Sequence, residues 1–253
     1  MTPGLRIVAP FRPCPPESEL HRQLAADGFD WLEALRMCTH SARLACGCPV
    51  HALTDLETTL PVETLHVPTT ERRLMLWTLD ACAAFLASQA FDRDTVMLDV
   101  DQLVYGNLAR YFTPGVNLGV LVRTTAKHAE GQPLLNGVQF WHRRNRSPLV
   151  RFYREALALA RTLPEDRLVW GADTDAVRQL LEPITLGIHE RAGLVVEMID
   201  AEQVLETYNN RLEWTVSQGL PVVPIRPVVD FRWFRKPAMA ALYRASIGAE
   251  VAC

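Results

Sequence analysis

The stretch Thr95-Val96-Met97-Leu98-Asp99-Val100-Asp101 decides the fold class of this chain. Its first four residues form an apolar run of strand length, and two aspartates separated by one valine follow directly. Because side chains on extended backbone alternate, both carboxylates are expected to point to the same side of the chain. Open α/β sheets bind ligands beyond the carboxyl ends of their strands. The stretch therefore predicts a buried strand that ends in a ligand site.

Two neighbouring carboxylates, Asp99 and Asp101, make an oxygen-rich site. Such a pair suits a hard divalent cation, Mn²⁺ or Mg²⁺, that also holds substrate phosphates. The alternative is a pair of turn aspartates that cap a loop, which is the usual role of an isolated pair. Four apolar residues directly before the pair favour the cation, because burying two like charges without one is unfavourable.

The rest of the chain alternates predicted strands and helices. Strands are predicted over residues 5–9, 50–53, 64–67, 95–98, 103–105, 116–123 and 134–142, with a β-rich tail over 222–231. Helices are predicted from Trp31 after an N-cap at Asp30, and over 71–88, 147–163 and 174–181. Since no repeat, low-complexity tract or linker interrupts this order, the sequence predicts a single α/β domain over residues 1–253.

Composition and charge exclude several classes of protein. With 49% hydrophobic and 22% charged residues, the chain is typical of a soluble globular protein and unlike a coiled coil, a collagen or a disordered scaffold. Lysine plus arginine number 26 against 29 for aspartate plus glutamate, a net charge of −3. The protein therefore has no overall attraction to nucleic acid or to an anionic membrane, and any polyanion site must be local.

The number of cysteines and the length of the apolar segments indicate the cellular setting of the protein. Six cysteines are sparse for 253 residues, and no signal segment opens the sequence, so we expect a reducing, cytoplasmic setting. Cys46-Gly47-Cys48 lacks the second ligand pair of a structural zinc site. The longest apolar stretch, residues 74–87, contains Asp80 and is too short for a transmembrane helix.

The segment around Asp99 resembles the D-x-D motif of GT-A fold nucleotide-sugar glycosyltransferases, especially the glycogenin and galactosyltransferase-like group. Further segments are similar to that family in its order along the chain. They are Leu135-Asn136-Gly137-Val138-Gln139-Phe140 for its "N-x-G-v" strand, Trp170-Gly171-Ala172-Asp173-Thr174-Asp175 for its "D-Q-d" segment, Tyr208-Asn209 for its "yN", and residues 228–237 for its "H-F-x-G-x-x-K-P" motif. In the last of these, Asp230 stands at the histidine and Trp233 at the glycine. The resemblance implies a single GT-A-like domain, a Rossmann-like mixed sheet flanked by helices.

The resemblance also implies how the donor and the cation are held. Asp99, Val100 and Asp101 would contact the donor nucleotide, and the two aspartates would bind Mn²⁺ or Mg²⁺. Asp230 would be the third metal ligand, since a carboxylate is an acceptable hard-oxygen substitute for the family's histidine. Lys236 would neutralise the departing diphosphate, a role that needs only a point charge.

Other matched positions lie on the sugar side of the implied site. Asn136 and Gly137 would line the donor sugar, although a strand glycine at a bulge is equally compatible with the sequence. Asp173 matches the acidic position near the reacting sugar carbon, and as an alternative it caps the helix predicted over 174–181. Arg73 stands where the family often places a basic residue that faces the donor, and it is equally compatible with a solvated position.

We therefore expect a metal-dependent glycosyltransferase that moves a sugar from a nucleotide-diphosphate donor, for which the resemblance favours a UDP-sugar, to an acceptor hydroxyl that the sequence does not identify. The resemblance implies retention of the anomeric configuration. One alternative is a non-catalytic nucleotide-sugar-binding protein on the same scaffold. A second is a haloacid-dehalogenase-like phosphatase with Asp99 as nucleophile, which Gln102-Leu103 disfavours because that motif continues as D-G-T. The chain has no G-x-S-x-G, P-loop or G-x-G-x-x-G motif, which disfavours the corresponding hydrolase, kinase and dinucleotide-binding classes.

Overall fold

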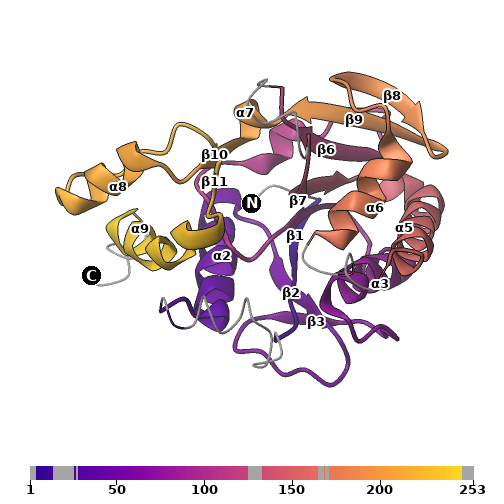
Figure 1. Cartoon of the computed structure of the whole chain (residues 1–253), viewed down its shortest axis with the longest axis horizontal. Coiled ribbons are helices and arrows are strands. Elements are labelled where there is room, and N and C mark those ends of the chain that lie inside the picture. Colours follow the sequence, from indigo (N-terminus) through magenta and orange to yellow (C-terminus); the bar gives the residue numbers. More distant parts are fainter. Residues whose placement is uncertain are drawn as a thin grey trace.

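A mixed sheet of eight strands forms the centre of the structure, a computed structural model that describes residues 4–13, 26, 28–124, 133–164, 168 and 171–246 (Figure 1). The strand order is β3-β2-β1-β4-β7-β6-β9-β8. These strands are β1 (Leu5–Pro10), β2 (Val50–Thr54), β3 (Thr64–His66), β4 (Asp94–Leu98), β6 (Leu118–Val122), β7 (Leu134–Trp141), β8 (Gly187–Arg191) and β9 (Leu194–Asp200). Strands β3, β2, β1 and β4 are parallel, and β7 runs antiparallel to both of its neighbours, β4 and β6.

A second, three-stranded sheet lies beyond the carboxyl end of β4. Its order is β10-β11-β5, and it is made from β5 (Gln102–Val104), β10 (Leu205–Thr207) and β11 (Val228–Asp230). Because β5 follows β4 after a three-residue turn, the chain passes from the large sheet to the small one at Asp99-Val100-Asp101. The predicted ligand site therefore lies where the two sheets meet.

Helices cover the two faces of the large sheet. On one face lie α3 (Leu74–Ala87), α5 (Arg146–Arg161) and α6 (Ala172–Leu181), and on the other lie α2 (Trp31–Cys46) and α9 (Met239–Ser246), as Figure 1 shows. The remaining helices of the described residues are α7 (Ala201–Val204), α8 (Asn210–Ser217) and the 3-10 turns η1 (Leu108–Tyr111), η2 (Arg143–Asn145) and η4 (Trp233–Ala238). None of the described helices is long and apolar enough to cross a membrane.

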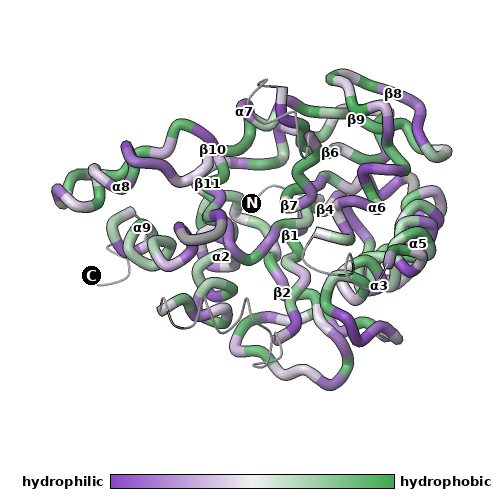
Figure 2. The backbone as a smooth tube through the Cα atoms, in the orientation of Figure 1, coloured by the Kyte–Doolittle hydropathy of each residue, from purple (hydrophilic) through white to green (hydrophobic). Residues whose placement is uncertain are grey.

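The sheet separates two large apolar cores because alternate residues of each strand face opposite sides. In β4, Met97 packs with α3 and α5, whereas its neighbours Val96 and Leu98 pack with α2 and the small sheet. The central strands β1 and β4 are buried on both faces and are accordingly apolar almost throughout (Figure 2). The predicted class, an α/β fold with a mixed sheet flanked by helices, is confirmed.

Most predicted elements are present, with shifted ends. The N-cap at Asp30 is confirmed, since its carboxylate accepts hydrogen bonds from the backbone N–H groups of Leu32 (2.8 Å) and Glu33 (3.3 Å). The helix predicted from Ser147 begins instead at Arg146, because η2 precedes it without a side-chain cap. The β-rich tail predicted over 222–231 forms only the short strand β11. Nothing in the sequence pattern predicted β8, β9 or α8. That residues 1–253 form one domain stays a prediction.

Candidate active site

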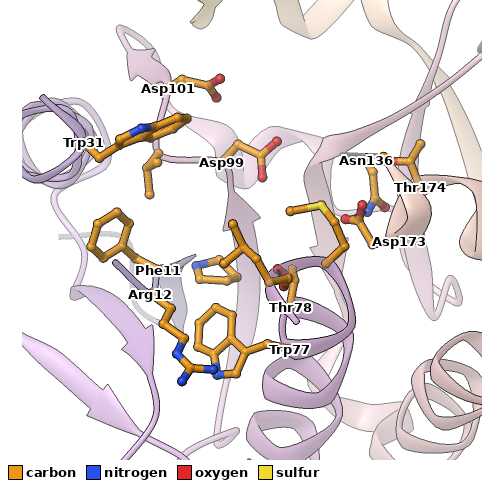
Figure 3. Close-up of a pocket in the computed structure, with 15 residues that line it drawn as sticks. Phe11, Arg12, Trp31, Trp77, Thr78, Asp99, Asp101, Asn136, Asp173 and Thr174 are labelled. Carbon is orange, nitrogen blue, oxygen red and sulfur yellow. Dashed lines mark hydrogen bonds between the residues drawn. The ribbon is translucent and has the colours of Figure 1, made fainter. Parts of the chain in front are cut away.

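The Asp99-Val100-Asp101 segment forms a turn and does not continue β4. The backbone is therefore not extended here as expected, but the carboxylates of Asp99 and Asp101 point in similar directions (Figure 3). Asp99 lies over β7, whereas Asp101 forms an ion pair with the Lys236 ammonium. Both aspartates nevertheless line the same two adjoining cavities. The Val100 side chain between them packs against Phe11 and helix α2 and lines the first cavity.

Strand β7 carries a bulge at the predicted Asn136-Gly137 position. Its pairing with β6 jumps from Val120 opposite Gln139 to Leu121 opposite Leu135, so residues 136–138 have no partner on β6. On the other side the Gly137 carbonyl accepts a hydrogen bond from the Asp99 backbone N–H at 2.8 Å. The alternative of a bulge glycine is thus what the structure shows, and the bulge turns Asn136 toward the cavities.

Asp173 lies in the first turn of α6 and contacts the bulge through Asn136. Its carboxylate accepts a hydrogen bond from the Asn136 side-chain amide, Nδ2 to Oδ2, at 3.0 Å. Gly171, with φ of 98°, is the N-cap of α6. The alternative role of Asp173, as the N-cap of this helix, is therefore wrong. Burial raises the pKa of Asp173 to about 6, and the charge of Asp99 adds to this rise.

Three carboxylates therefore lie near this junction of the two sheets: Asp230 is buried, Asp173 is half-buried and Asp99 is exposed. Burial raises the pKa of Asp99 to about 6, with a further contribution from the charge of Asp230. Burial likewise raises the pKa of Asp230 to about 6. Carboxylates gathered in this way favour the approach of cations.

The closing segment of the predicted motif supplies two cations to this centre. Lys236, in η4, pairs with Asp101, and its ammonium lies 5.0 Å from the centre of the Trp31 ring. Burial lowers the pKa of Lys236 to about 8. Arg232 forms an ion pair with Asp230, whose other oxygen accepts a 3.4 Å hydrogen bond from Gln102 Nε2. The Trp233 side chain, at the family's glycine position, lies outside the part of the chain that the structure describes.

Two cavities of different character adjoin across Asp99, Asp101 and Asn136. The first contains about 800 Å³ of open space, and aromatic and apolar side chains dominate its wall (Figure 3). Its lining includes Phe11, Arg12, Trp31, Trp77 and Thr78. The second contains about 1030 Å³ and is more polar, with Gln102, Arg123, Asp230, Arg232 and Lys236 in its wall. The predicted site residues lie at the boundary between an aromatic chamber and a charged one.

Arg73 is the exception among the predicted site residues. It occupies the N-cap position of α3 and lines a separate surface hollow with Arg72 and Arg161, and it is absent from the walls of both cavities. Its role in donor binding stays a prediction.

Sequence analysis missed the side chains that β1 brings to the aromatic cavity. Phe11 and Arg12 follow β1 directly, and β1 is the parallel neighbour of β4. Because the carboxyl ends of adjacent parallel strands meet at one edge, the position of Pro10-Phe11-Arg12 after a predicted strand was the available signal. Trp77 and Thr78 come from the interior of α3, and no local pattern distinguishes them from core residues.

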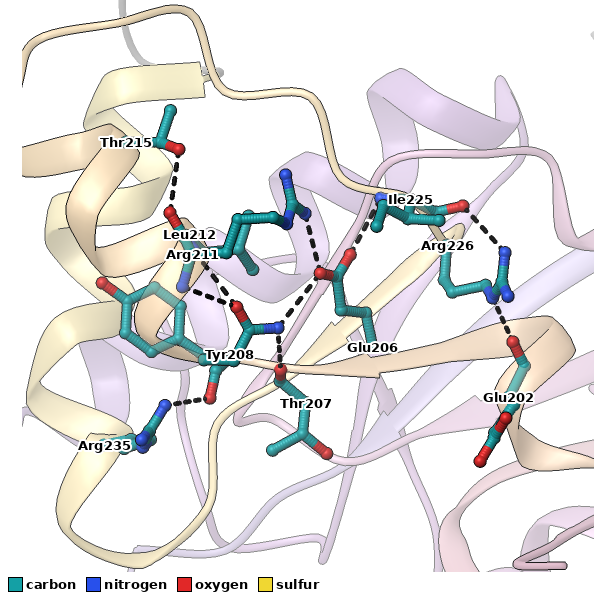
Figure 4. A network of polar contacts seen from close by, with 11 residues as sticks. Glu202, Glu206, Thr207, Tyr208, Arg211, Leu212, Thr215, Ile225, Arg226 and Arg235 are labelled. Atoms are coloured by element: carbon teal, nitrogen blue, oxygen red, sulfur yellow. Dashed lines mark hydrogen bonds and ion pairs between the residues drawn. The ribbon is translucent and has the colours of Figure 1, made fainter. Parts of the chain in front are cut away.

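The Tyr208-Asn209 segment lies beside the strand that carries Asp230, since the Tyr208 backbone N–H donates to the Asp230 carbonyl at 2.9 Å; Figure 4 shows its polar contacts. Asn209 caps α8, since its side-chain oxygen accepts from the backbone N–H groups of Arg211 (3.0 Å) and Leu212 (3.3 Å). The ring of Tyr208 stacks on Phe231, with ring centres 5.0 Å apart. This segment therefore fixes the end of β11 that carries Asp230.

The matches to known proteins come from solved structures. No protein-family model and no curated protein matches the sequence. Among solved structures, a glycosyltransferase involved in glycosylation of the major capsid of PBCV-1 superposes with a TM-score of 0.53 and 13% identity, over 94% of this chain and 100% of that one. The glycosyltransferase GlyE of Streptococcus pneumoniae TIGR4, in its apo form, gives 0.54 and 10% over 96% of this chain. The bifunctional glycosyltransferase WbbM gives 0.52 and 7% over 98% of this chain.

The chain has a glycosyltransferase fold. It spans 60% of the GlyE chain and 52% of the WbbM chain, and the whole of the capsid glycosyltransferase. At these identities the likeness concerns the fold. The glycosyltransferase fold leaves the haloacid-dehalogenase-like alternative without structural support.

The oxygen atoms of this glycosyltransferase-fold site fit a hard divalent cation in chemical type. Among the residues that the structure describes, no three His, Cys, Asp or Glu side chains gather closely enough to hold a metal ion by themselves. Mg²⁺ typically takes one or two carboxylates and completes its shell with substrate phosphates, and a cation site at Asp99 and Asp101 stays a prediction. Beside it, the buried Gln102 Oε1 has no hydrogen-bond partner among the described residues. Asp230 as a third metal ligand stays a prediction.

Proposed function

We propose that this protein is a metal-dependent glycosyltransferase that transfers a sugar from a nucleotide-diphosphate donor, a UDP-sugar, to an acceptor hydroxyl. The observation that carries the proposal is the boundary between the two cavities. There a carboxylate pair, Asp99 and Asp101, meets the cation Lys236 and the hydrogen-bonded pair Asn136 and Asp173. A nucleotide-sugar donor has the matching order of parts: an aromatic base, a diphosphate and a polar sugar.

The aromatic cavity suits the nucleoside. The rings of Phe11 and Trp31 provide apolar surface for a base. The Arg12 side chain is held by an ion pair with Asp55, Nε to Oδ2, at 3.3 Å, so its guanidinium is fixed at the wall.

Lys236, Asp99 and Asp101 would handle the diphosphate. The Lys236 ammonium would stabilise the negative charge that develops as the sugar–phosphate bond breaks. Asp99 and Asp101 would hold the cation, which when bound would add positive charge at the same phosphates. Lys236 can move from Asp101 to a phosphate oxygen without desolvating further, because it is already buried.

Asn136 and Asp173 would face the donor sugar. In the transfer the bond from the anomeric carbon to the diphosphate oxygen breaks with its electron pair on that oxygen. The acceptor oxygen then bonds to the anomeric carbon, and its proton passes to the departing phosphate. The half-buried Asp173 carboxylate would stabilise the positive charge that develops on the sugar ring, and retention of configuration belongs to the proposal.

Thermal stabilisation of the protein by UDP-, GDP-, CMP- and dTDP-sugars, with and without Mn²⁺, tests the donor site. We expect metal-dependent stabilisation by the UDP-sugars that is lost in Asp101→Ala, because a ligand that binds only the folded state raises its melting temperature. Glu155→Ala is the matched control, since it removes one exposed carboxylate on α5. No response to any nucleotide sugar would refute the donor site. Stabilisation without nucleotide release would favour the non-catalytic binding protein.

A further inference from the structure

The β7 bulge leaves backbone groups of residues 136–138 without partners on β6, and one buried side chain compensates for this. Gln139 is fully buried, and its Nε2 lies 3.3 Å from the backbone oxygen of Asn136. The same Nε2 also donates to the side-chain oxygen Oδ1 of Asn136. Gln139 therefore holds both the backbone and the side chain of the residue that contacts Asp173.

The opposite end of the Gln139 amide is fixed from the apolar core. Its Oε1 accepts a hydrogen bond from Trp141 Nε1 at 3.0 Å and another from the Tyr153 hydroxyl. The Trp141 indole N–H donates to Gln139 Oε1 at 3.0 Å and to the Tyr153 hydroxyl at 2.9 Å, and because it can only donate, the amide atom that faces it is the oxygen. The amide nitrogen of Gln139 consequently points at Asn136.

The orientation of the Gln139 amide fixes that of the Asn136 amide, which lines both cavities. Because Gln139 presents a donor to Asn136, Asn136 must present its oxygen to Gln139 and its Nδ2 to Asp173, which it reaches at 3.0 Å. The direction of the bonds from Gln139 to Asp173 is thus set by two core groups, the Trp141 indole N–H and the Tyr153 hydroxyl. Networks of this kind in a low-dielectric interior rigidify the groups they join.

We propose that Gln139 is a positioning residue for glycosyl transfer, which locks Asn136 with its amide donor aimed at Asp173. This inference rests on the proposed function, because Asn136 and Asp173 face the sugar only if the cavities hold a donor. Gln139 is absent from the walls of both cavities, so it acts through Asn136. Packing alone would not require a glutamine at this place, since an apolar side chain of similar size would fill the space.

Gln139→Met tests the proposal, because methionine has a similar volume and neither donates nor accepts in this arrangement. We expect kcat for nucleotide release to fall about 10- to 100-fold with little change in the donor KM. In an Asn136→Ala background the same substitution should have no further effect on kcat, because the residue through which Gln139 acts is gone. Equal loss in both backgrounds would overturn the proposal.

Phe152→Leu is the matched control for lost stability, since Phe152 is fully buried in the same core, next to Tyr153. It should lower the melting temperature and leave kcat unchanged. If it lowers kcat as much as Gln139→Met does, the effect of Gln139 is one of stability and the proposal fails.

A measurement that needs no turnover separates this proposal from the proposed function. In protein labelled with ¹⁵N-asparagine, the Asn136 side-chain signals can be assigned by their loss in Asn136→Ala. From ¹⁵N relaxation we expect a high order parameter for the Asn136 side-chain amide in the wild type and a clearly lower one in Gln139→Met. A mobile Asn136 amide already in the wild type would overturn the positioning role. Absence of nucleotide release from any donor, with a rigid Asn136 amide in the wild type, would refute the function and leave the lock on Asn136 in place.

Discussion

The Asp99 carboxylate occupies the space where a side chain of residue 137 would begin. Its Oδ2 lies 2.6 Å from the position that a Cβ atom on Gly137 would take, closer than real Cβ contacts come. Gln102 Nε2 lies 2.8 Å from the same position. A Cβ atom at residue 137 would therefore push the Asp99 carboxylate aside, and the glycine of the bulge leaves room for that group in the site.

Gly137→Ala should displace Asp99 and weaken donor binding at least tenfold, with a loss of about 1–3 kcal/mol in the free energy of unfolding from overpacking. Calorimetric titration with the donor and chemical denaturation measure the two effects. Gly119→Ala is the control, because its Cβ would meet Phe140 at 3.1 Å in the core, away from both cavities. It should reduce stability and leave donor affinity unchanged. If both variants bind the donor like the wild type, donor binding does not depend on the position of the Asp99 carboxylate.

Lys236→Ala should lower kcat by about 10²–10³-fold, because removing a charge that stabilises the transition state typically has an effect of that size. Donor KM should change less. Arg73→Ala should change kcat by less than about twofold, since Arg73 lines neither cavity. Steady-state kinetics of nucleotide release measure both. A larger effect of Arg73→Ala than of Lys236→Ala would favour the donor-facing role that the sequence assigned to Arg73.

Asp92→Asn should reduce stability at neutral pH and have no effect in strong acid. A side-chain hydrogen bond from Arg93, with the nearby charge of Arg6, lowers the pKa of Asp92 to about 2, below its unfolded value of about 3.9. The contribution of Asp92 is therefore complete above the unfolded pKa and is lost as the pH falls through 2.

Because the Asp92 side chain is 46% exposed, we expect less than about 1 kcal/mol at pH 7. Denaturant unfolding of wild type and variant between pH 2 and pH 7 measures the difference. A difference that grows on acidification would contradict the ion pair.

Glu206→Ala should reduce the free energy of unfolding by about 1–3 kcal/mol, since it removes a buried carboxylate that accepts three hydrogen bonds. The Glu206 carboxylate accepts from Arg211 (2.7 Å), Asn209 (3.2 Å) and the Ile225 backbone N–H (2.8 Å), as Figure 4 shows. Burial opposes ionisation, and these hydrogen bonds outweigh it and lower the pKa of Glu206. Hydrogen exchange should speed up at Ile225 and along β10, where Thr207 pairs with Asp230. Glu213→Ala, an exposed change on α8, should leave exchange there unaltered.

The sequence by itself determined the fold class and much of the cavity boundary. An apolar strand followed by Asp99 and Asp101 is a local pattern, because strand burial and the position of polar residues after a strand are written in consecutive residues. The resemblance added Asn136, Asp173 and Lys236, which the structure brings together with them. The N-cap at Asp30 was equally local, since a cap bonds only the next two or three residues.

Only the tertiary structure decided which of these groups touch. Lys236 and Asp101 are 135 positions apart, and Asn136 and Asp173 are 37 apart, so their pairing depends on how β7, α6 and η4 pack. The aromatic wall of Phe11, Trp31 and Trp77, and the lock that Gln139 places on Asn136, likewise join elements distant in the sequence. Contacts of this kind are selected by the burial of whole strand and helix faces, and no run of consecutive residues records them.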